Sequence, residues 1–169
     1  MKVYVAGAYT EREMIARYIA RLIAAGVEIT FDWPANIVQA GKPDHEFTHE
    51  ERQLHSEKNI KGIEDADVFW LLIPSGASKG AWLELGYAHA LMRWRPASEP
   101  VGPHRIAVVV SGNATASNFT SMRGTIFFHD HEAAYAELAA LGRLDSLPAC
   151  KECGGTFGKH IEPCRRTVS

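Results

Sequence analysis

The sequence lacks several features that would place a protein in a special class. Only three of its 169 residues are cysteine, and all three lie near the carboxyl terminus, which argues against a secreted disulfide framework. The formal net charge of −2 offers no attraction to a nucleic acid polymer or an anionic membrane. No apolar run is long enough to span a bilayer, and the first residues follow a strand pattern rather than that of a signal peptide. These absences predict a cytoplasmic protein with neither a membrane nor a nucleic acid polymer as partner.

The chain does contain a regular alternation of short apolar segments and segments with helical spacing. Strands are expected at residues 3–6, 27–31, 68–73, 106–110 and 125–128, helices at residues 11–25, 47–63, 80–93 and 131–141, and a long loop at residues 35–46. This alternation predicts an α/β fold, a doubly wound sandwich of the flavodoxin or Rossmann kind with a mainly parallel five-stranded sheet. We assign it to one domain at residues 1–142, followed by a tail at residues 143–169.

Two of the expected helices carry more specific predictions. The first is expected to begin at a capping box, with Thr10 as N-cap and Glu13 three residues later, and to end at Gly26. Its predicted apolar face consists of Ile15, Tyr18, Ile19, Leu22 and Ile23. The predicted apolar side of the helix at residues 47–63 consists of Leu54, Ile60 and Ile63.

Glu84 is the most informative single residue. It is expected in the first turn of the helix that follows the most hydrophobic strand, among apolar and small neighbours. An acidic side chain is costly to bury unless its charge is used, and the partial positive charge of a helix N-terminus favours its ionised form. The carboxyl end of a buried parallel strand is also where an α/β enzyme places a nucleophile. The alternative interpretation is a solvent-facing glutamate that the helix dipole favours.

Loops that follow the first two strands are predicted to meet at the carboxyl ends of the sheet, where the ligand crevice of such a fold lies. The first loop combines the small residues Gly7 and Ala8 with the aromatic Tyr9. The second offers the carboxylate of Asp32 and the indole of Trp33, which suit hydrogen bonding and stacking on a flat ring. Each loop alone is also explained by ordinary turn chemistry.

A third loop reaches the same edge before the helix of Glu84. It contains Ser78, Lys79 and Gly80, and the free N–H groups at a helix start bind anions. Lys79 is equally explained as a solvated loop charge. The three loops together suit a ligand with an aromatic base, a sugar and a phosphate.

Three segments resemble the nucleoside 2-deoxyribosyltransferases and the related 2'-deoxynucleoside 5'-phosphate N-hydrolases. They are residues 4–8 (YVAGA), residues 60–68 (IKGIEDADV) and residues 84–88 (ELGYA), and the likeness runs in order through residues 1–140. The last segment is the most specific. The resemblance implies that Glu84 is the nucleophile, that Tyr4 contacts its carboxylate, and that Ser78 binds a 5'-phosphate.

The reaction that this resemblance implies is cleavage of the N-glycosidic bond of a (deoxy)nucleoside or nucleoside 5'-monophosphate, with retention of configuration. Glu84 would attack C1' and form a glycosyl-enzyme intermediate, which water (in a hydrolase) or a second base (in a transferase) resolves. Ser78 and Lys79 favour the hydrolase, because they indicate a monophosphate, as in the hydrolytic branch of the family. The family also implies a homo-oligomer, a dimer or larger, and no cofactor for catalysis.

Residue 59 departs from the family pattern. Where the family usually has an aspartate that handles the proton on the departing base, this chain has Asn59, and an amide cannot donate a proton as an acid does. Asn59 is still expected to hydrogen-bond the base or the sugar. The proton would come from another group, for which Asp32, His45, His49 and Asp65 are candidates, or the base would leave without it, or the substrate would differ.

Two other functions stay open, the first of them because of Asn59. One is a non-catalytic nucleotide-binding or sensing module on the same fold. The other is an NAD glycohydrolase-type activity, because the related TIR-type fold also places a glutamate at this position.

The tail contains a set of metal-binding residue types with the spacing C-x2-C-x6-H-x3-C: Cys150, Cys153, His160 and Cys164. Three thiolates and an imidazole are a ligand set of structural zinc, and closing around Zn2+ would order a segment that has no core of its own. The alternative is a tail with free thiols. Four protein ligands leave no open position, so a zinc ion there is expected to be structural rather than catalytic.

Overall fold

The computed structural model describes residues 1–41, 46–93, 106–113 and 118–142. Strands and helices alternate along these residues. In chain order they are β1 (Lys2–Ala6), η1 (Tyr9–Glu11), α1 (Arg12–Ala24), β2 (Glu28–Ile29), α2 (Trp33–Ala40), α3 (His49–Glu64), β3 (Val68–Leu72), α4 (Lys79–Arg93), β4 (Ala107–Ser111), η4 (Asn118–Ser121), β5 (Thr125–Phe128) and α5 (His131–Gly142). The two η elements are short 3-10 helices.

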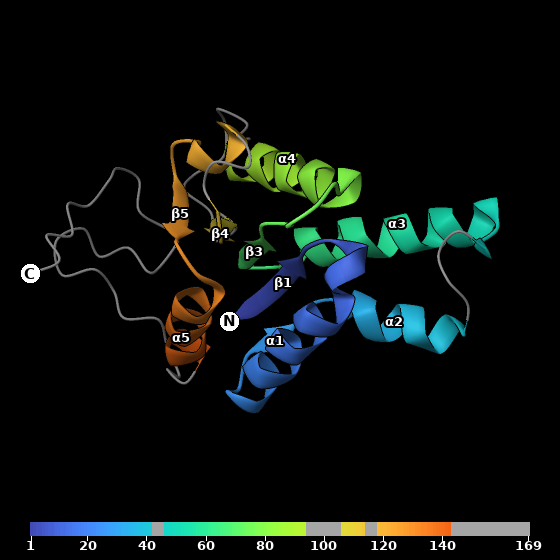
Figure 1. The fold of residues 1–169 in the computed structure, drawn as a ribbon, viewed down its shortest axis with the longest axis horizontal. Coiled ribbons are helices and arrows are strands. Elements are labelled where there is room, and N and C mark those ends of the chain that lie inside the picture. Colours follow the sequence, from blue (N-terminus) through green and yellow to red (C-terminus); the bar gives the residue numbers. More distant parts are fainter. Residues whose placement is uncertain (42–45, 94–105, 114–117, 143–169) are drawn as a thin grey trace, which may run out of the picture.

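The strands form one sheet in the order β2-β1-β3-β4-β5, and every described pair is parallel (Figure 1). All residues of β3 and β4 are buried. Continuous apolar strands of this kind are typical of a parallel sheet that is covered on both faces. The predicted doubly wound α/β fold is therefore confirmed.

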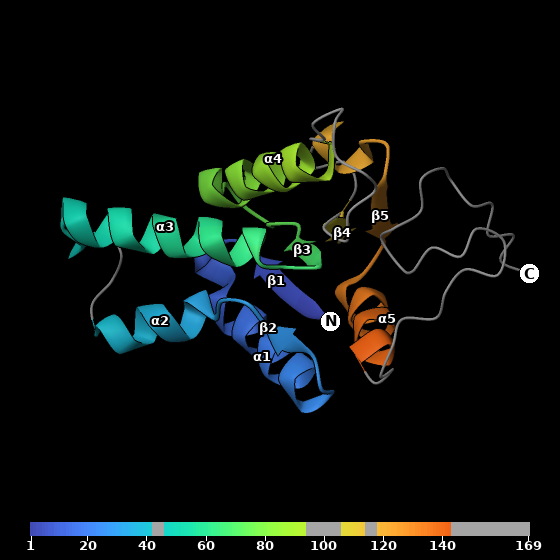
Figure 2. The same cartoon turned by 180° about the vertical axis from the view of Figure 1, so that it is seen from behind.

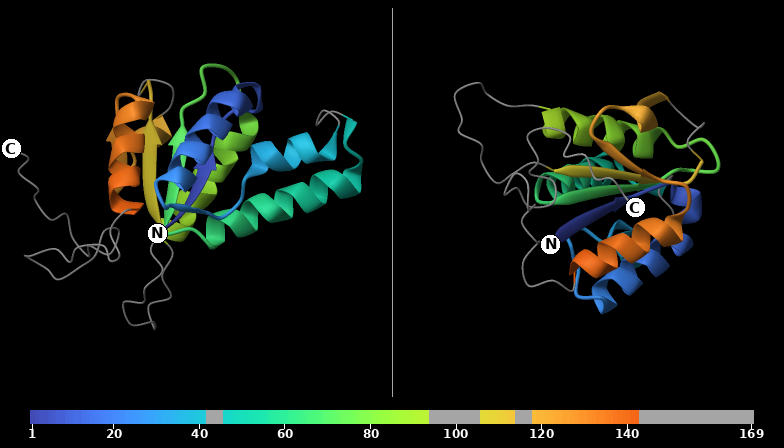
Figure 3. Two further views of the ribbon diagram at one scale, coloured as in Figure 1. Left: turned by 90° about the horizontal axis from the view of Figure 1, so that it is seen from below. Right: turned by 90° about the vertical axis from the view of Figure 1, so that its left-hand side faces the viewer.

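Helices cover both faces of the sheet in a three-layer arrangement (Figure 3). α1 contacts α5 on one face, and α3 contacts α4 on the other. On the α1 side, the ring of Trp70 meets Tyr18 edge-on with centroids 5.3 Å apart. On the opposite side Tyr4 stacks on Phe69 with centroids 5.9 Å apart. Tyr4 therefore points into the layer formed by α3 and α4.

The helix α2 occupies part of the segment that was expected to be a loop, so that prediction was wrong. Asp32 is its N-cap and accepts a hydrogen bond from the Ala35 N–H at 3.0 Å, and Pro34 lies in the first turn. Gly41 ends it in the left-handed region, at φ 68°. Seen from behind, α2 lies beside the amino-terminal half of α3 (Figure 2). The preceding strand, β2, is correspondingly shorter than predicted.

The predicted capping box at Thr10 is also wrong. A 3-10 turn precedes α1 instead, and no side chain caps the first turn of α1. A capping box is present at α3, where Thr48 Oγ1 accepts from the Glu51 N–H at 3.2 Å and Glu51 Oε2 accepts from the Thr48 N–H at 2.7 Å.

The buried faces of the two helices differ in how well they match the expectation. α1 buries four of its five predicted apolar residues, namely Ile15, Tyr18, Ile19 and Leu22, whereas Ile23 is 53% exposed. In α3 the predicted apolar face is wrong for two residues: Leu54 is 54% exposed and Ile60 is 38% exposed. The buried residues of α3 are Gly62 and Ile63.

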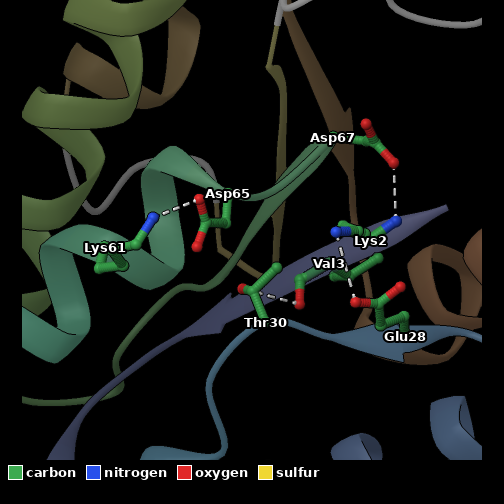
Figure 4. Close-up of polar contacts among 7 residues, drawn as sticks. All are labelled: Lys2, Val3, Glu28, Thr30, Lys61, Asp65 and Asp67. Atoms are coloured by element: carbon green, nitrogen blue, oxygen red, sulfur yellow. Dashed lines mark hydrogen bonds and ion pairs between the residues drawn. The ribbon is translucent and has the colours of Figure 1, made fainter.

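A polar cluster closes the amino edge of the sheet (Figure 4). The backbone N–H of Lys2 donates to Asp67 Oδ2 at 2.8 Å, and Lys2 Nζ lies 3.5 Å from Glu28 Oε1. Asp65, at the end of α3, accepts a hydrogen bond from Lys61 Nζ at 2.7 Å. These charged groups lie at the edge opposite the carboxyl ends of the strands.

No helix among the described residues combines the length and the apolar content that crossing a bilayer requires.

Candidate active site

The topology places a switch point, and with it the expected ligand crevice, at the carboxyl ends of β1 and β3. The helix that follows β1 covers one face of the sheet, and the helix that follows β3 covers the other, so the two loops diverge between these neighbouring strands. In doubly wound sheets the ligand binds at such a switch point. The side chains of the site have to come from these loops and from the helices beside them.

Glu84 and Tyr4 are the central pair. The Tyr4 hydroxyl donates a hydrogen bond to Glu84 Oε1 at 3.0 Å, which links the middle of β1 to α4. Tyr4 is fully buried, and Glu84 is partly buried. The contact expected between these two residues is present in the structure, while their catalytic roles stay predictions.

Burial, rather than the helix dipole, dominates the ionisation of Glu84. Because α4 begins at Lys79, Glu84 lies in its second turn, so the expectation of a first-turn position was wrong. Dipole effects fade beyond the first turn. Burial raises the pKa of the Glu84 carboxyl to about 7, although the hydrogen bond from Tyr4 lowers it. Burial, and then the charge of Glu84, raise the pKa of Tyr4 well above 10, so its phenol remains a hydrogen-bond donor.

α3 lies directly against Tyr4. A side chain added at Gly62 would place its Cβ only 2.9 Å from Tyr4 Cδ2 and 2.9 Å from Phe31 Cβ, so glycine is required for this close approach. Asn59 lies three positions earlier and hence on the same face of the helix. Its Oδ1 is buried and has no hydrogen-bond partner among the described residues.

Asn59 and Glu84 lie at similar positions along the axes of α3 and α4, beside Tyr4. The Tyr87 hydroxyl donates to Glu64 Oε1 at 2.6 Å and thereby ties α4 to α3, which both run opposite to the strands. Glu84 precedes Tyr87 by three residues and Asn59 precedes Glu64 by five. At about 1.5 Å of rise per residue, the two side chains start within roughly one helical turn of each other.

His55 extends the same face of α3 by another turn. Its ring lies 5.8 Å from that of Phe31 and 6.2 Å from that of Phe47, both in edge-to-face geometry. His55 lies four positions before Asn59. This face of α3 is therefore lined with a histidine and an amide where an ordinary helix would present aliphatic side chains.

The start of α4 is open to solvent. Ser78 precedes the helix, and its Oγ accepts a hydrogen bond from the Ala81 N–H at 3.4 Å. Lys79 and Gly80 are exposed, and no atom lies within 4 Å of the Cβ that a side chain would add at Gly80. The six residues from Ser78 to Glu84 correspond to about 9 Å along the helix axis, which leaves room for a sugar.

The first loop has a packing explanation for its small residues. A Cβ at Gly7 would lie 2.5 Å from Ile15 Cδ1, so the glycine allows α1 to approach, and Ala8 is only 2% exposed. Both small residues therefore have a packing role, and their predicted contact with a ligand stays a prediction. Tyr9 is partly exposed, and the Arg12 guanidinium lies 5.2 Å from the centre of its ring.

Asp32 and Trp33 have structural partners as well. One Asp32 oxygen caps α2, and the Trp33 indole N–H donates to the Val5 carbonyl at 2.9 Å. Trp33 is 6% exposed, so the predicted stacking of a ligand on this indole is wrong. The short strand β2 pairs only with Lys2 and Val3 of β1. The indole N–H therefore provides a hydrogen bond to a β1 carbonyl that β2 does not reach.

Three of the four candidate proton sources lie among the described residues, and none of these three hydrogen-bonds to Glu84. Asp65 lies at the amino edge, Asp32 caps α2, and His49 is exposed at the first position of α3. His45 lies outside the described residues. His55 lies on the same face of α3 as Asn59, four residues before it.

Sequence reasoning also missed a contact between two loops. Glu11 Oε1 accepts hydrogen bonds from the Ser75 N–H at 3.0 Å and the Ser75 hydroxyl at 2.5 Å. Nothing in the local sequence relates residues that are 64 positions apart.

The zinc prediction falls on residues outside the part of the chain that the structure describes, namely Cys150, Cys153, His160 and Cys164. Among the described residues there is no group of three or more His, Cys, Asp or Glu side chains placed to hold a metal ion.

Comparison with known proteins found no matching family model, no matching curated protein and no matching solved structure. The function therefore has to be argued from the site itself.

Proposed function

We propose that this chain cleaves the N-glycosidic bond of a (deoxy)nucleoside or nucleoside 5'-monophosphate, with Glu84 as the nucleophile. The observation that carries the proposal is the pair formed by Glu84 and the buried Tyr4, whose hydroxyl lies 3.0 Å from the carboxylate at the carboxyl side of the sheet. The resemblance of residues 84–88 to the deoxyribosyltransferase-like family supports it. We place the protein in the cytoplasm and expect it to form a homo-oligomer.

The ionisation of Glu84 suits this chemistry. A carboxylate with a pKa of about 7 is half ionised near neutral pH and more basic than an exposed carboxylate. Tyr4 holds Oε1 by a hydrogen bond, which leaves Oε2 to attack. As the new C1'–O bond forms, the C1'–N bond breaks and its electron pair goes to the base. Water or a second base then displaces Glu84 from C1' and restores the original configuration.

The departing base needs a proton that Asn59 cannot give. We assign this proton to His55, one helical turn away on the same face of α3. The unpartnered Oδ1 of Asn59 then accepts a hydrogen bond from an N–H or O–H of the ligand, because a buried acceptor without a partner costs about 1–3 kcal/mol.

A panel of substrates tests the reaction. Wild-type protein, Glu84→Gln and the exposed control Glu13→Gln are incubated with deoxynucleosides, their 5'-monophosphates and NAD, and free base is measured by chromatography. We expect base release by the wild type and the control, and a loss of at least a thousandfold in Glu84→Gln. Acid-quenched protein should carry a pentosyl mass on the peptide that contains Glu84. Base release that survives Glu84→Gln would contradict the proposal.

Other outcomes of the panel identify the alternatives. Release of nicotinamide from NAD alone would indicate an NAD glycohydrolase. Binding of nucleotides in calorimetry without release of any base would indicate a binding or sensing module.

The pH dependence and the leaving group test the roles of Tyr4 and His55. The value of kcat/KM should rise with pH through an apparent pKa near 7. Tyr4→Phe should raise this apparent pKa by on the order of one unit, because it removes the hydrogen bond that favours the carboxylate.

His55→Gln should slow release of guanine but leave release of a 7-methylated guanine unchanged, because that base leaves without a proton. Equal slowing of both bases would exclude His55 as the acid.

We also propose that Cys150, Cys153, His160 and Cys164 hold a structural Zn2+, on the basis of their spacing. Elemental analysis should find about one zinc per chain, lost in Cys150→Ser with Cys153→Ser. Absence of zinc together with full titration of three free thiols would exclude it.

A further inference from the structure

Glu11 joins the two loops that border the crevice. It ends the 3-10 turn after β1, and its Oε1 accepts two hydrogen bonds from Ser75, the third residue after β3 ends at Leu72. The distances are 3.0 Å to the backbone N–H and 2.5 Å to the hydroxyl. Hydrogen bonds to a charged acceptor are stronger than those between neutral groups.

The loop that Glu11 holds leads directly into α4. Residues 75–77 are exposed, and no atom lies within 4 Å of the Cβ that a side chain would add at Gly76 or Gly80. Packing therefore does little to fix this segment, and the two bonds to Glu11 are its described anchor. Glu84 has an anchor of its own, the hydrogen bond from Tyr4.

The other oxygen of the Glu11 carboxylate is enclosed without a hydrogen-bond partner among the described residues. Such an arrangement costs free energy that a neutral or apolar anchor would avoid. Burial lowers the pKa of His131 at the start of α5, and the charge of the Glu11 carboxylate partly opposes this by raising it. Its charge thus reaches a further element at the same edge of the sheet.

We propose that Glu11 is a positioning residue of the candidate site. It holds the segment from Ser75 to Ser78 beside the position where the sugar or phosphate of a ligand binds. This inference rests on the proposed function at Glu84. It assigns Glu11 no contact with the reacting atoms. Because Glu84 keeps its bond to Tyr4, loss of Glu11 is expected to weaken binding rather than slow the chemical step.

Kinetics of matched variants test the role. Glu11→Ala should raise the KM of the preferred substrate at least tenfold and leave kcat within threefold of the wild type. Glu11→Gln keeps an oxygen acceptor for Ser75, so it should restore KM to within threefold, and Ser75→Ala, which keeps the N–H donor, should fall between them. The control Glu13→Gln, an exposed acid two residues away on α1, should change neither constant. A Glu11→Gln variant as impaired as Glu11→Ala, or an unchanged KM in Glu11→Ala, would overturn the proposal.

Amide hydrogen exchange gives a readout that does not depend on activity. Exchange in residues 75–80 should be at least fivefold faster in Glu11→Ala than in the wild type and close to the wild-type rate in Glu11→Gln, with β1 and β3 unchanged. If the wild type releases no base, the proposed function fails, and exchange with and without bound deoxynucleoside monophosphate decides the role of Glu11 instead. Unchanged exchange in Glu11→Ala, or protection of these residues by the nucleotide equal in both proteins, would overturn it.

Discussion

α1 and α3 cover opposite faces of the same sheet, yet different kinds of side chain line their buried faces. α1 turns an aliphatic and aromatic stripe inward, including Ile15, Ile19 and Leu22, all at most 1% exposed. α3 turns His55 and Asn59 toward the layer of Tyr4 and leaves Leu54 more than half exposed. Enclosing an acceptor without a partner, such as Asn59 Oδ1, costs about 1–3 kcal/mol, so α3 is not arranged for stability alone.

The difference shows where function departs from packing. A helix whose inward face is apolar follows the transfer free energy of its side chains. A helix that encloses an amide oxygen without a hydrogen-bond partner among the described residues is typical of a site that a ligand completes. α3 is the helix that lies against Tyr4, the partner of Glu84.

The largest expected effect comes from truncating the same residue type in each helix. Leu22→Ala in α1 should lower the free energy of unfolding by about 2–5 kcal/mol, because it leaves a cavity in the core. Leu54→Ala in α3 should change it by less than about 0.5 kcal/mol, because that side chain is exposed. Urea denaturation measures both. Similar losses in the two variants would contradict the comparison.

The next largest effect concerns Glu84 and depends on pH. Its folded-state pKa of about 7 lies above the ordinary value of 4.5, so the native state binds more protons than the unfolded state between these pH values. Stability contributed by the protonated carboxyl is therefore present below pH 4.5 and lost as the pH rises through 7. Glu84→Gln removes this dependence and should be more stable than the wild type at pH 8, by on the order of 1–3 kcal/mol, but not at pH 4.5. Thermal unfolding at the two pH values measures it, and parallel pH curves would argue against a buried carboxyl.

Asn59→Leu should separate stability from function within α3. Removing a buried acceptor that has no partner should leave the free energy of unfolding unchanged or raise it by about 1 kcal/mol, while base release falls at least tenfold. The reverse change in α1, Ile19→Asn, should destabilise by about 3 kcal/mol or more, because it buries an amide in the core. If Asn59→Leu destabilised as strongly as Ile19→Asn, Asn59 would be a structural residue.

The smallest effect distinguishes the two possible capping boxes. Thr48→Ala should cost about 1 kcal/mol, because its hydroxyl caps α3, whereas Thr10→Ala should cost little, because no side chain caps α1. A larger loss for Thr10→Ala would restore the box predicted there.

Much of the fold followed from local patterns. The all-buried runs in β3 and β4 and the stripe of α1 are visible in the sequence because each reflects the burial of its own side chains. α2 was predictable too, since Asp32, Pro34 and Gly41 are its start and stop signals, but these were assigned to a loop and a ligand site. The indole of Trp33 was misjudged because its partner, the Val5 carbonyl, belongs to another strand.

By itself the sequence determined the parallel α/β layers and singled out Glu84, because apolar periodicity and an acid in an apolar helix are local properties. Only the tertiary structure decided what sets the pKa of Glu84, which face α3 turns inward and what holds the loop before α4. Tyr4 and Glu84 are 80 residues apart, and Glu11 and Ser75 are 64 apart. Such contacts, and the burial of the side chains that make them, form only in the folded protein, where the sheet brings the strands and their following loops side by side.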